Sequence, residues 1–352
     1  MDNLMEYLHH AVEVGASDLF FIAGGPASLK IDGHITRLGD ERLLPPATTS
    51  IIEDIYKLSG RPMDDYLRTG DDDFSFAVPG LSRFRVNAYR QRNSYAAVIR
   101  VVSFDIPDWT KIGIPREVLD LSSVRDGMIL FTGTAGSGKS TTQACIIDHI
   151  NKTRDCHIIT LEDPIEYLHK NQRSIISQRE ISIDTADYLS ALRACLRQAP
   201  DVILLGEMRD AETIRTAITA AETGHTVIAT MHTKGAVNAI DRVIDCFADS
   251  QQAQIRFQLA TVLRTVVSQQ MLPDTDGNIT PAFEIMHINN AIKGMIRDNK
   301  NYQIENAITA GKAEGMISMD SYLLKLYGEG RITAETLVNY ADHPDHMTRH
   351  IK

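Results

Sequence analysis

The sequence is poor in cysteine, tryptophan and long hydrophobic runs. Its four cysteines, Cys145, Cys156, Cys195 and Cys246, include no C-x-x-C pair. This excludes the usual zinc and redox motifs and favours reduced thiols in a cytosolic protein. No apolar run approaches the length of a membrane span, and the N-terminal residues do not resemble a signal peptide. We therefore expect a cytoplasmic protein that reaches a membrane, if at all, by docking from the cytoplasm.

Basic residues are also in the minority. Lys and Arg total 36 against 46 Asp and Glu, which gives a formal net charge of −10 at pH 7. Because nucleic acids attract basic surfaces, this balance speaks against bulk nucleic-acid binding, although it leaves room for a local basic patch. The length of 352 residues is sufficient for two domains.

Residues 1–105 have the pattern of a small mixed α+β domain. We expect helices near 4–14 and 47–58, and strands at 18–24, 27–33, 83–90 and 96–102. In the strand at 83–90, apolar Phe84 and Val86 alternate with Arg83 and Arg85, so the arginines point away from the domain core. Two prolines and the only tryptophan, Trp109, predict a linker at 106–115.

Strands and helices alternate in the next part of the chain, 116–352. Continuous apolar runs at 127–133, 156–163, 201–207 and 225–231 are typical of strands buried on both faces of a parallel sheet. Helices are expected at 185–197 and 210–222, so the fold class is α/β. From about residue 235 the strand signals fade, and we expect helices up to the C-terminus, including the segment 252–272.

A phosphate-binding loop lies near the middle of the chain. The stretch "FTGTAGSGKSTT" at 131–142 fits G-x-x-x-x-G-K-[ST]. The alternative, a glycine-rich turn before a helix, is weakened by the apolar strand that precedes it. Lys139 is expected to reach the β and γ phosphates of ATP, and the Ser140 hydroxyl to bind Mg²⁺. The candidate nucleotide-binding residues are Gly133, Thr134, Ala135, Gly136, Ser137, Gly138, Lys139, Ser140 and Thr141.

Hydrolysis also needs carboxylates, and two stretches supply them directly after apolar strands. "LEDPIE" contains Glu162, Asp163 and Glu166, and "LLGE" ends in Glu207. Such positions lie near the crevice at the carboxyl ends of parallel strands. One carboxylate could hold Mg²⁺ through water while another orients or deprotonates the attacking water. The alternative for either stretch alone is a solvated loop.

Two histidines, His225 and His232, flank the apolar run "TVIATM". They point to opposite faces if the strand is regular, so a shared metal is not expected. Each could sense the γ-phosphate, bridge to a neighbouring subunit or be structural.

Four ordered segments carry a resemblance to a known family. "GTAGSGKSTT", "IITLEDPIEYLH", "PDVILLGEMRD" and "AETGHTVIATMHT" look like the phosphate loop, Asp box, Walker B and His box of the ATPases that power type II secretion and type IV pili. Within that superfamily the chain resembles the pilus retraction ATPases of the PilT type, over nearly its whole length. The resemblance implies a PAS-like N-terminal domain, a RecA-like ATPase domain and a homohexamer. It further implies ATP-driven pilus retraction with a platform protein at the cytoplasmic face of the inner membrane.

The resemblance also assigns roles to residues of this chain. It makes Glu162 the Asp-box acid that polarises water, Glu207 the Walker B acid near Mg²⁺, and His225 and His232 the His box. Two arginines of the N-terminal domain are placed against the γ-phosphate in this superfamily. Those that match best are Arg85 and Arg100, with Arg83, Arg90 and Arg92 as alternatives. The division of labour between Glu162 and Glu207 stays open.

A further family segment, the retraction motif, matches "AIKGMIRD" at 291–298 with a glycine, Gly294, in place of a polar side chain. We expect Ile292, Ile296 and Arg297 to share one side of a helix and form a transmission surface; the alternative is an ordinary amphipathic helix. Other functions compatible with the sequence are a pilus extension or type II secretion ATPase, although the chain lacks a four-cysteine insert. A RecA-like nucleic-acid motor and a regulator that binds nucleotide without hydrolysing it are further alternatives.

Overall fold

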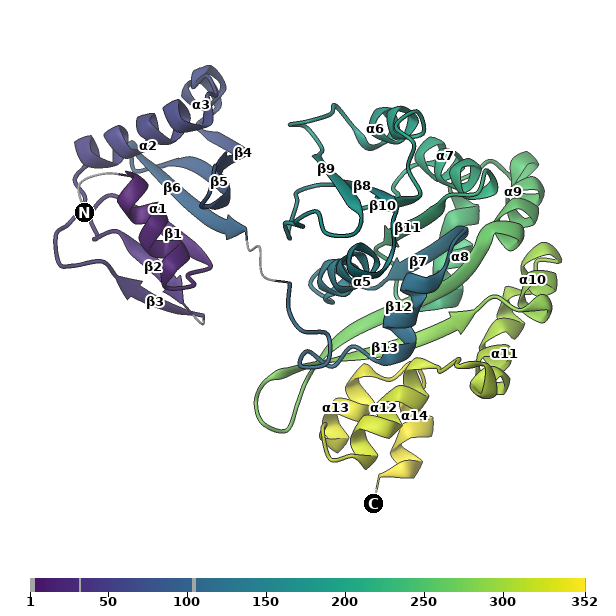
Figure 1. Ribbon diagram of the computed structural model, residues 1–352. Coiled ribbons are helices and arrows are strands. Elements are labelled where there is room, and N and C mark those ends of the chain that lie inside the picture. Colours follow the sequence, from purple (N-terminus) through teal and green to yellow (C-terminus); the bar gives the residue numbers. More distant parts are fainter. Residues whose placement is uncertain (1–3, 32, 103–105, 352) are drawn as a thin grey trace. The chain divides into compact units, whose positions relative to one another are not determined.

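The computed structural model describes residues 4–31, 33–102 and 106–351. Asp32, within the second expected strand, and the expected domain boundary at 105 lie outside these ranges. The chain divides into two compact units, one formed by residues before Ile106 together with Glu166–Leu168, and the other by 106–165 and 169–351 (Figure 1). Among the described helices, none combines the length and apolarity needed to cross a bilayer.

The first unit is a six-stranded antiparallel sheet with helices packed on one face. Its strand order is β3-β2-β1-β6-β5-β4. The helices are α1 (Leu4–Glu13), α2 (Pro45–Ser59) and α3 (Asp64–Thr69). The strands are β1 (Asp18–Phe21), β2 (Ser28–Ile31), β3 (His34–Arg37), β4 (Asp71–Val78), β5 (Ser82–Gln91) and β6 (Ser94–Val102). The alternation predicted in 83–90 is confirmed, because Phe84, Val86 and Ala88 are fully buried and Arg83 and Arg85 are not.

The second unit contains a seven-stranded sheet in the order β13-β12-β7-β11-β10-β8-β9. All neighbours are parallel except β13, which pairs antiparallel with β12. The strands are β7 (Gly127–Thr132), β8 (His157–Glu162), β9 (Ile175–Glu180), β10 (Val202–Leu205), β11 (Thr226–Met231), β12 (Leu263–Pro273) and β13 (Ile279–His287).

Helices cover both faces of this sheet. They are α4 (Arg116–Leu119), α5 (Lys139–Thr153), α6 (Tyr188–Cys195), α7 (Ala211–Glu222), α8 (Ala236–Asp245), α9 (Asp249–Val262), α10 (Asn290–Arg297), α11 (Ile304–Ala310), α12 (Met319–Gly328), α13 (Ala334–Tyr340) and α14 (Pro344–Met347). Several begin at a side-chain cap; for example, the side chain of Asp210 accepts a hydrogen bond from Thr213 N at the start of α7.

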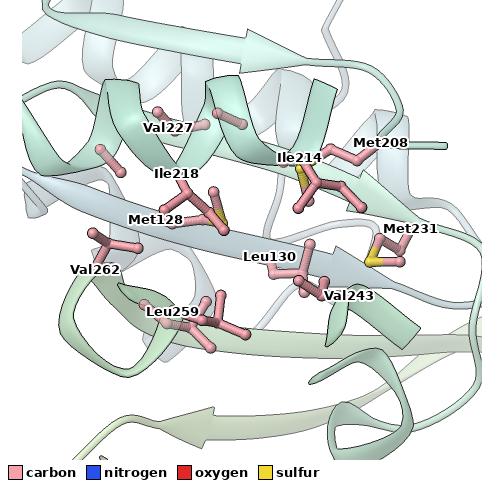
Figure 2. Close-up of a cluster of buried hydrophobic side chains, with 14 of the residues drawn as sticks. Met128, Leu130, Met208, Ile214, Ile218, Val227, Met231, Val243, Leu259 and Val262 are labelled. Atoms are coloured by element: carbon pink, nitrogen blue, oxygen red, sulfur yellow. The ribbon is translucent and has the colours of Figure 1, made fainter. Parts of the chain in front are cut away.

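The strand residues alternate between two hydrophobic clusters. Met128 and Leu130 of β7 pack with α6 to α10, while Ile129 and Phe131 pack with α5, α12 and α13 on the opposite face. Figure 2 shows the first cluster, with side chains of β7, α7 and α9 gathered together. Because both faces of each central strand are buried, the strand sequences are continuously apolar.

Two sequence expectations for this unit are wrong. The helix expected over 252–272 ends at Val262, and the rest is strand β12, whose Thr265, Val266 and Val267 are buried. A short apolar run buried on both sides has no period that separates helix from strand. The segment 106–115, expected as a linker, packs into the second unit, with Ile114 buried in one of its clusters. The sequence pattern also does not predict β9 and β13 of this unit or β3 and β4 of the first.

Candidate nucleotide and hydrolysis site

The phosphate loop joins β7 to α5, and two of its glycines have no room for a side chain. Gly133 has φ 144°, and a Cβ there would lie 2.3 Å from the Gln269 carbonyl oxygen of β12. Gly138, the N-cap of α5, has φ 83°, and a Cβ would lie 2.8 Å from the Gln269 side-chain nitrogen. The backbone of β12 therefore leaves no room for a side chain at Gly133, and the positive φ favours glycine at Gly138.

Lys139 lies inside the curve of its own loop. Its Nζ donates hydrogen bonds of 2.8 Å to the carbonyl oxygens of Gly133 and Thr134, and one of 3.3 Å to Ser137 Oγ. The ammonium group thus lies at the N-terminus of α5, where backbone N–H groups favour an anion. A bound phosphate would contact both the N–H groups and Lys139. Next to it, Thr134, Ala135, Gly136 and Ser140 are exposed, and Thr141 is partly so. A phosphate can therefore approach the loop from solvent.

The predicted acids lie at the same edge of the sheet as this loop. Glu162 is the last residue of β8, and Glu207 follows β10 by one glycine. Strands β7, β11, β10 and β8 are consecutive parallel neighbours, so their carboxyl ends meet along one edge. This is the edge at which open α/β sheets bind ligands.

The Glu162 carboxylate accepts hydrogen bonds from side chains of β8 and β9. Thr160 Oγ1 donates to Glu162 Oε1 at 2.6 Å, and Gln178 Nε2 of β9 donates to the same oxygen at 3.2 Å. Sequence reasoning missed Gln178, because β9 is amphipathic and only half-buried. The hydrogen bonds orient one carboxylate oxygen while the side chain stays near the strand end.

The Glu207 carboxylate is paired with two basic side chains. Arg209 Nη2 lies 2.6 Å from Glu207 Oε2, and His232 Nε2 lies 3.5 Å from Glu207 Oε1. The ion pair raises the pKa of Arg209, chiefly through its hydrogen bond to Glu207. His232 follows β11 directly, so the structure brings it to the edge that carries the phosphate loop and Glu207.

His225 lies at the opposite edge. It precedes β11, and its Nδ1 is 2.9 Å from the Ala220 carbonyl oxygen and 3.1 Å from Thr223 Oγ1. The six residues of β11 separate the two histidines, a distance of about 20 Å along a strand. The structure therefore does not bring His225 to the phosphate loop of its own chain, and a metal shared by the two histidines is excluded.

Arg85 and Arg100 lie on the first unit, directly opposite each other in the β5–β6 register. Arg85 Nη2 is 2.6 Å from Asp73 Oδ2, and Arg100 Nε is 3.0 Å from Asp18 Oδ1. They form a charged group on the sheet face away from the helices. The alternative Arg90 differs, because its guanidinium lies over the Tyr95 ring at 5.3 Å.

A cavity of about 440 Å³ opens beside the phosphate loop. Gly138 and Thr141 line the end of the cavity next to the phosphate loop. Apolar side chains line much of the rest, among them Ile112, Met271 and Ile279. Its polar lining includes Arg331, whose Nη2 donates to Thr280 Oγ1 at 2.6 Å. Sequence reasoning missed this cavity, because its walls come from the expected linker, the unforeseen β12–β13 hairpin and the loop before α13.

Comparison with known proteins gives the family. A family described as "Type II/IV secretion system protein" matches residues 1–315. This chain belongs to that family. It is 39% identical over 345 residues to the type IV pilus retraction ATPase PilT of Pseudomonas aeruginosa, covering 98% of this chain and 100% of the relative. A twitching motility protein of Neisseria gonorrhoeae is 42% identical over 284 residues, 80% of this chain and 76% of the relative.

A solved structure agrees over the whole length. The crystal structure of the pilus retraction motor PilT with bound ADP has a TM-score of 0.89 and 41% identity, covering 99% of each chain. The mixed α/β fold is therefore that of the secretion ATPases.

The segment that resembles the family's retraction motif forms α10, but it does not present the expected surface. Ile292 and Ile296 are fully buried in the larger core cluster, whereas Arg297 is exposed. The expectation that the two isoleucines form a transmission surface with Arg297 is wrong. The two isoleucines, at positions i and i+4, face the core. Arg297 follows one residue later, about 100° further around the helix, and so points away from the core.

Proposed function

We propose that this chain is a Mg²⁺-dependent ATPase that works as a homohexamer to drive type IV pilus retraction. The observation that carries the proposal is the meeting of Lys139, Glu162 and Glu207 at the carboxyl ends of parallel strands. Full-length similarity to PilT supports the coupling of hydrolysis to retraction.

Hydrolysis in this site needs an attacking water and a proton acceptor. The water oxygen forms a bond to the γ-phosphorus, the bond from that phosphorus to the β,γ-bridging oxygen breaks, and ADP leaves with the electron pair. The water proton passes to a carboxylate, either Glu162 or Glu207. When ATP binds, Lys139 would give up its hydrogen bonds to the loop carbonyl oxygens and donate to phosphate oxygens instead. Its positive charge would offset the negative charge of the phosphates.

The residues present suit Mg²⁺ held largely by phosphate and water. Among the described residues there is no cluster of three or more His, Cys, Asp or Glu side chains that could hold a metal. Mg²⁺ commonly takes only one or two protein oxygens in such sites. The Ser140 hydroxyl would supply one, and Glu207 would act through water. The ion would neutralise charge on the β and γ phosphates.

The base of the nucleotide fits the cavity beside the loop. Its apolar side chains, such as Ile112 and Met271, suit the faces of a planar ring, and Arg331 offers donors at the rim. With the base there, the phosphates would lie at Gly138 and Lys139, next to β12.

We assign the first unit to a PAS-like domain and the second to a RecA-like domain. The helix-backed antiparallel sheet supports the first assignment, and the parallel order β12-β7-β11-β10-β8 around the phosphate loop supports the second. In a homohexamer, Arg85 and Arg100 would reach the γ-phosphate from a separate unit, and His225 would face a neighbouring subunit.

Retraction is favoured over pilus extension or type II secretion by the extent of the similarity. A type II secretion protein E of Xanthomonas campestris is 31% identical, and the match covers only 47% of it, whereas PilT is matched over its full length. We place the motor at the cytoplasmic face of the inner membrane, against a pilus platform protein. The net charge of −10 disfavours a nucleic-acid motor.

Glu207→Gln tests the hydrolytic assignment. The change is nearly isosteric and removes the charge, so ATP should still bind while turnover falls by about 10²-fold or more. Binding is measured by calorimetry and turnover by phosphate release. Lys139→Ala is the companion variant, and it should lose both. Unchanged turnover in folded Glu207→Gln would refute the role of Glu207, and turnover stimulated by single-stranded DNA would favour the nucleic-acid motor.

A further inference from the structure

Tyr188, the first residue of α6, lies near the edge of the sheet that carries Glu162 and Glu207, here called the carboxylate edge. None of the sequence motifs contains this tyrosine. Its ring packs against the larger core cluster. Its hydroxyl lies over Gly206, because a Cβ on that glycine would be 2.9 Å from the Tyr188 hydroxyl oxygen. The same Cβ would be 3.0 Å from the Leu161 carbonyl oxygen. The hydroxyl therefore lies at the ends of β8 and β10, beside the residues that precede Glu162 and Glu207.

The charges around this hydroxyl keep its proton in place. Burial raises the pKa of Tyr188, and the carboxylates of Asp163, Glu207 and Glu162 raise it further. Arg209 acts in the opposite direction but does not reverse the shift. The hydroxyl stays neutral at physiological pH, so it can donate one hydrogen bond and accept another, but it cannot serve as a base.

The hydroxyl is also open to a ligand. Among the described residues it has no hydrogen-bond partner, and its oxygen is not one of the buried polar atoms that lack one. If Tyr188 served only to pack its ring against the core, its hydroxyl oxygen could lie anywhere in bulk water. Here it lies within the electrostatic influence of Asp163, Glu207 and Glu162, at the edge where the attacking water must be held.

We propose that the Tyr188 hydroxyl positions the attacking water of ATP hydrolysis. Its oxygen accepts a hydrogen bond from one O–H of the water, and its own O–H, which keeps its proton, is free to turn toward a carboxylate of the same edge when the water binds. The other O–H of the water is left for the carboxylate that takes the proton, and an oxygen lone pair is left for the γ-phosphorus. This inference rests on the proposed ATPase function and adds a residue to it.

Tyr188→Phe tests the proposal, because it removes the hydroxyl and keeps the ring. We expect kcat to fall about five- to tenfold, the worth of one hydrogen bond, with KM for ATP and melting temperature near wild type. The matched control is Tyr322→Phe, a buried tyrosine of α12 that packs on Phe283, and its kcat should stay at the wild-type value.

Gly206→Ala supplies a second variant. Its Cβ would crowd both the Tyr188 hydroxyl and the Leu161 carbonyl oxygen. It should therefore lower kcat in the wild type, and by a smaller factor in the Tyr188→Phe background, where only the second contact remains. Equal factors in both backgrounds would contradict the proposal. So would a Tyr188→Phe enzyme with kcat within twofold of wild type, or one in which KM and melting temperature change along with kcat. If the wild type itself hydrolyses no ATP, the proposed function fails first and this inference with it.

Discussion

Glu284, in β13, shows how one buried carboxylate can join two helix ends. Its Oε1 accepts a 2.6 Å hydrogen bond from Ala236 N at the start of α8, and its Oε2 accepts one of 3.4 Å from Met319 N at the start of α12. Burial raises its pKa to about 7, and Asp342 and Glu305 raise it further. An unfolded chain would release the proton near pH 4.5. The folded state therefore holds the proton to higher pH, and the contribution of Glu284 to stability falls as pH rises from about 4.5 to about 7.

Glu284→Gln should remove this pH dependence, because glutamine does not titrate. The free energy of unfolding of the wild type should decline relative to the variant between pH 5 and 7, by about 3 kcal/mol at most. Urea denaturation at several pH values measures it. Glu329→Gln, an exposed residue just after α12 that is not among the groups acting on Glu284, is the control and should parallel the wild type. Parallel curves for Glu284→Gln as well would contradict the argument.

At the scale of elements, α10 has one buried side and one exposed side. Asn289 caps its start by accepting a hydrogen bond from Ile292 N at 3.1 Å. Because Ile292 is fully buried, Ile292→Ala should lower the free energy of unfolding by about 2–5 kcal/mol and reduce ATPase activity with it. Thermal and urea denaturation measure the loss.

Arg297→Ala is the matched change on the exposed side of the same helix. Stability should stay within about 0.5 kcal/mol of wild type, and ATPase activity should be retained. If this side contacts the pilus machinery, cells carrying the variant should fail to retract pili. Normal twitching would show that Arg297 has no part in transmission.

At the scale of the whole molecule, we expect the active site to be shared between subunits. Arg85 and Lys139 lie in separate units of the chain, and an arginine supplied from a neighbour couples hydrolysis to assembly. Arg85→Ala and Lys139→Ala subunits should each be inactive. Random equimolar mixing should restore both wild-type residues at about one interface in four, which phosphate release would detect.

The control for this experiment is a mixture of Lys139→Ala and Glu207→Gln subunits. Both residues lie at one edge of the same sheet, so no combination of these subunits should restore an intact site. Recovery in the control, or none in verified mixed rings of Arg85→Ala and Lys139→Ala, would argue against a shared site.

The parts of this protein that depend on local chemistry are predictable from the residues alone. The phosphate loop needs glycines and Lys139 at fixed spacing, and the central strands are continuously apolar because they are buried on both faces. The positions of Glu162 and Glu207 after such strands follow from the same pattern. These features could be read without knowing what lies beside them.

Features that depend on neighbours distant in sequence arise only when the chain is folded. Strand β12 is extended because it fills the place beside β7, and no local period marks it. The carboxylate edge acquires Gln178 from β9 and Tyr188 from α6, which no motif predicts. His225 and His232, so close in sequence, end at opposite edges because a strand runs between them. Which side chain meets another is fixed by packing, and packing is a property of the whole fold.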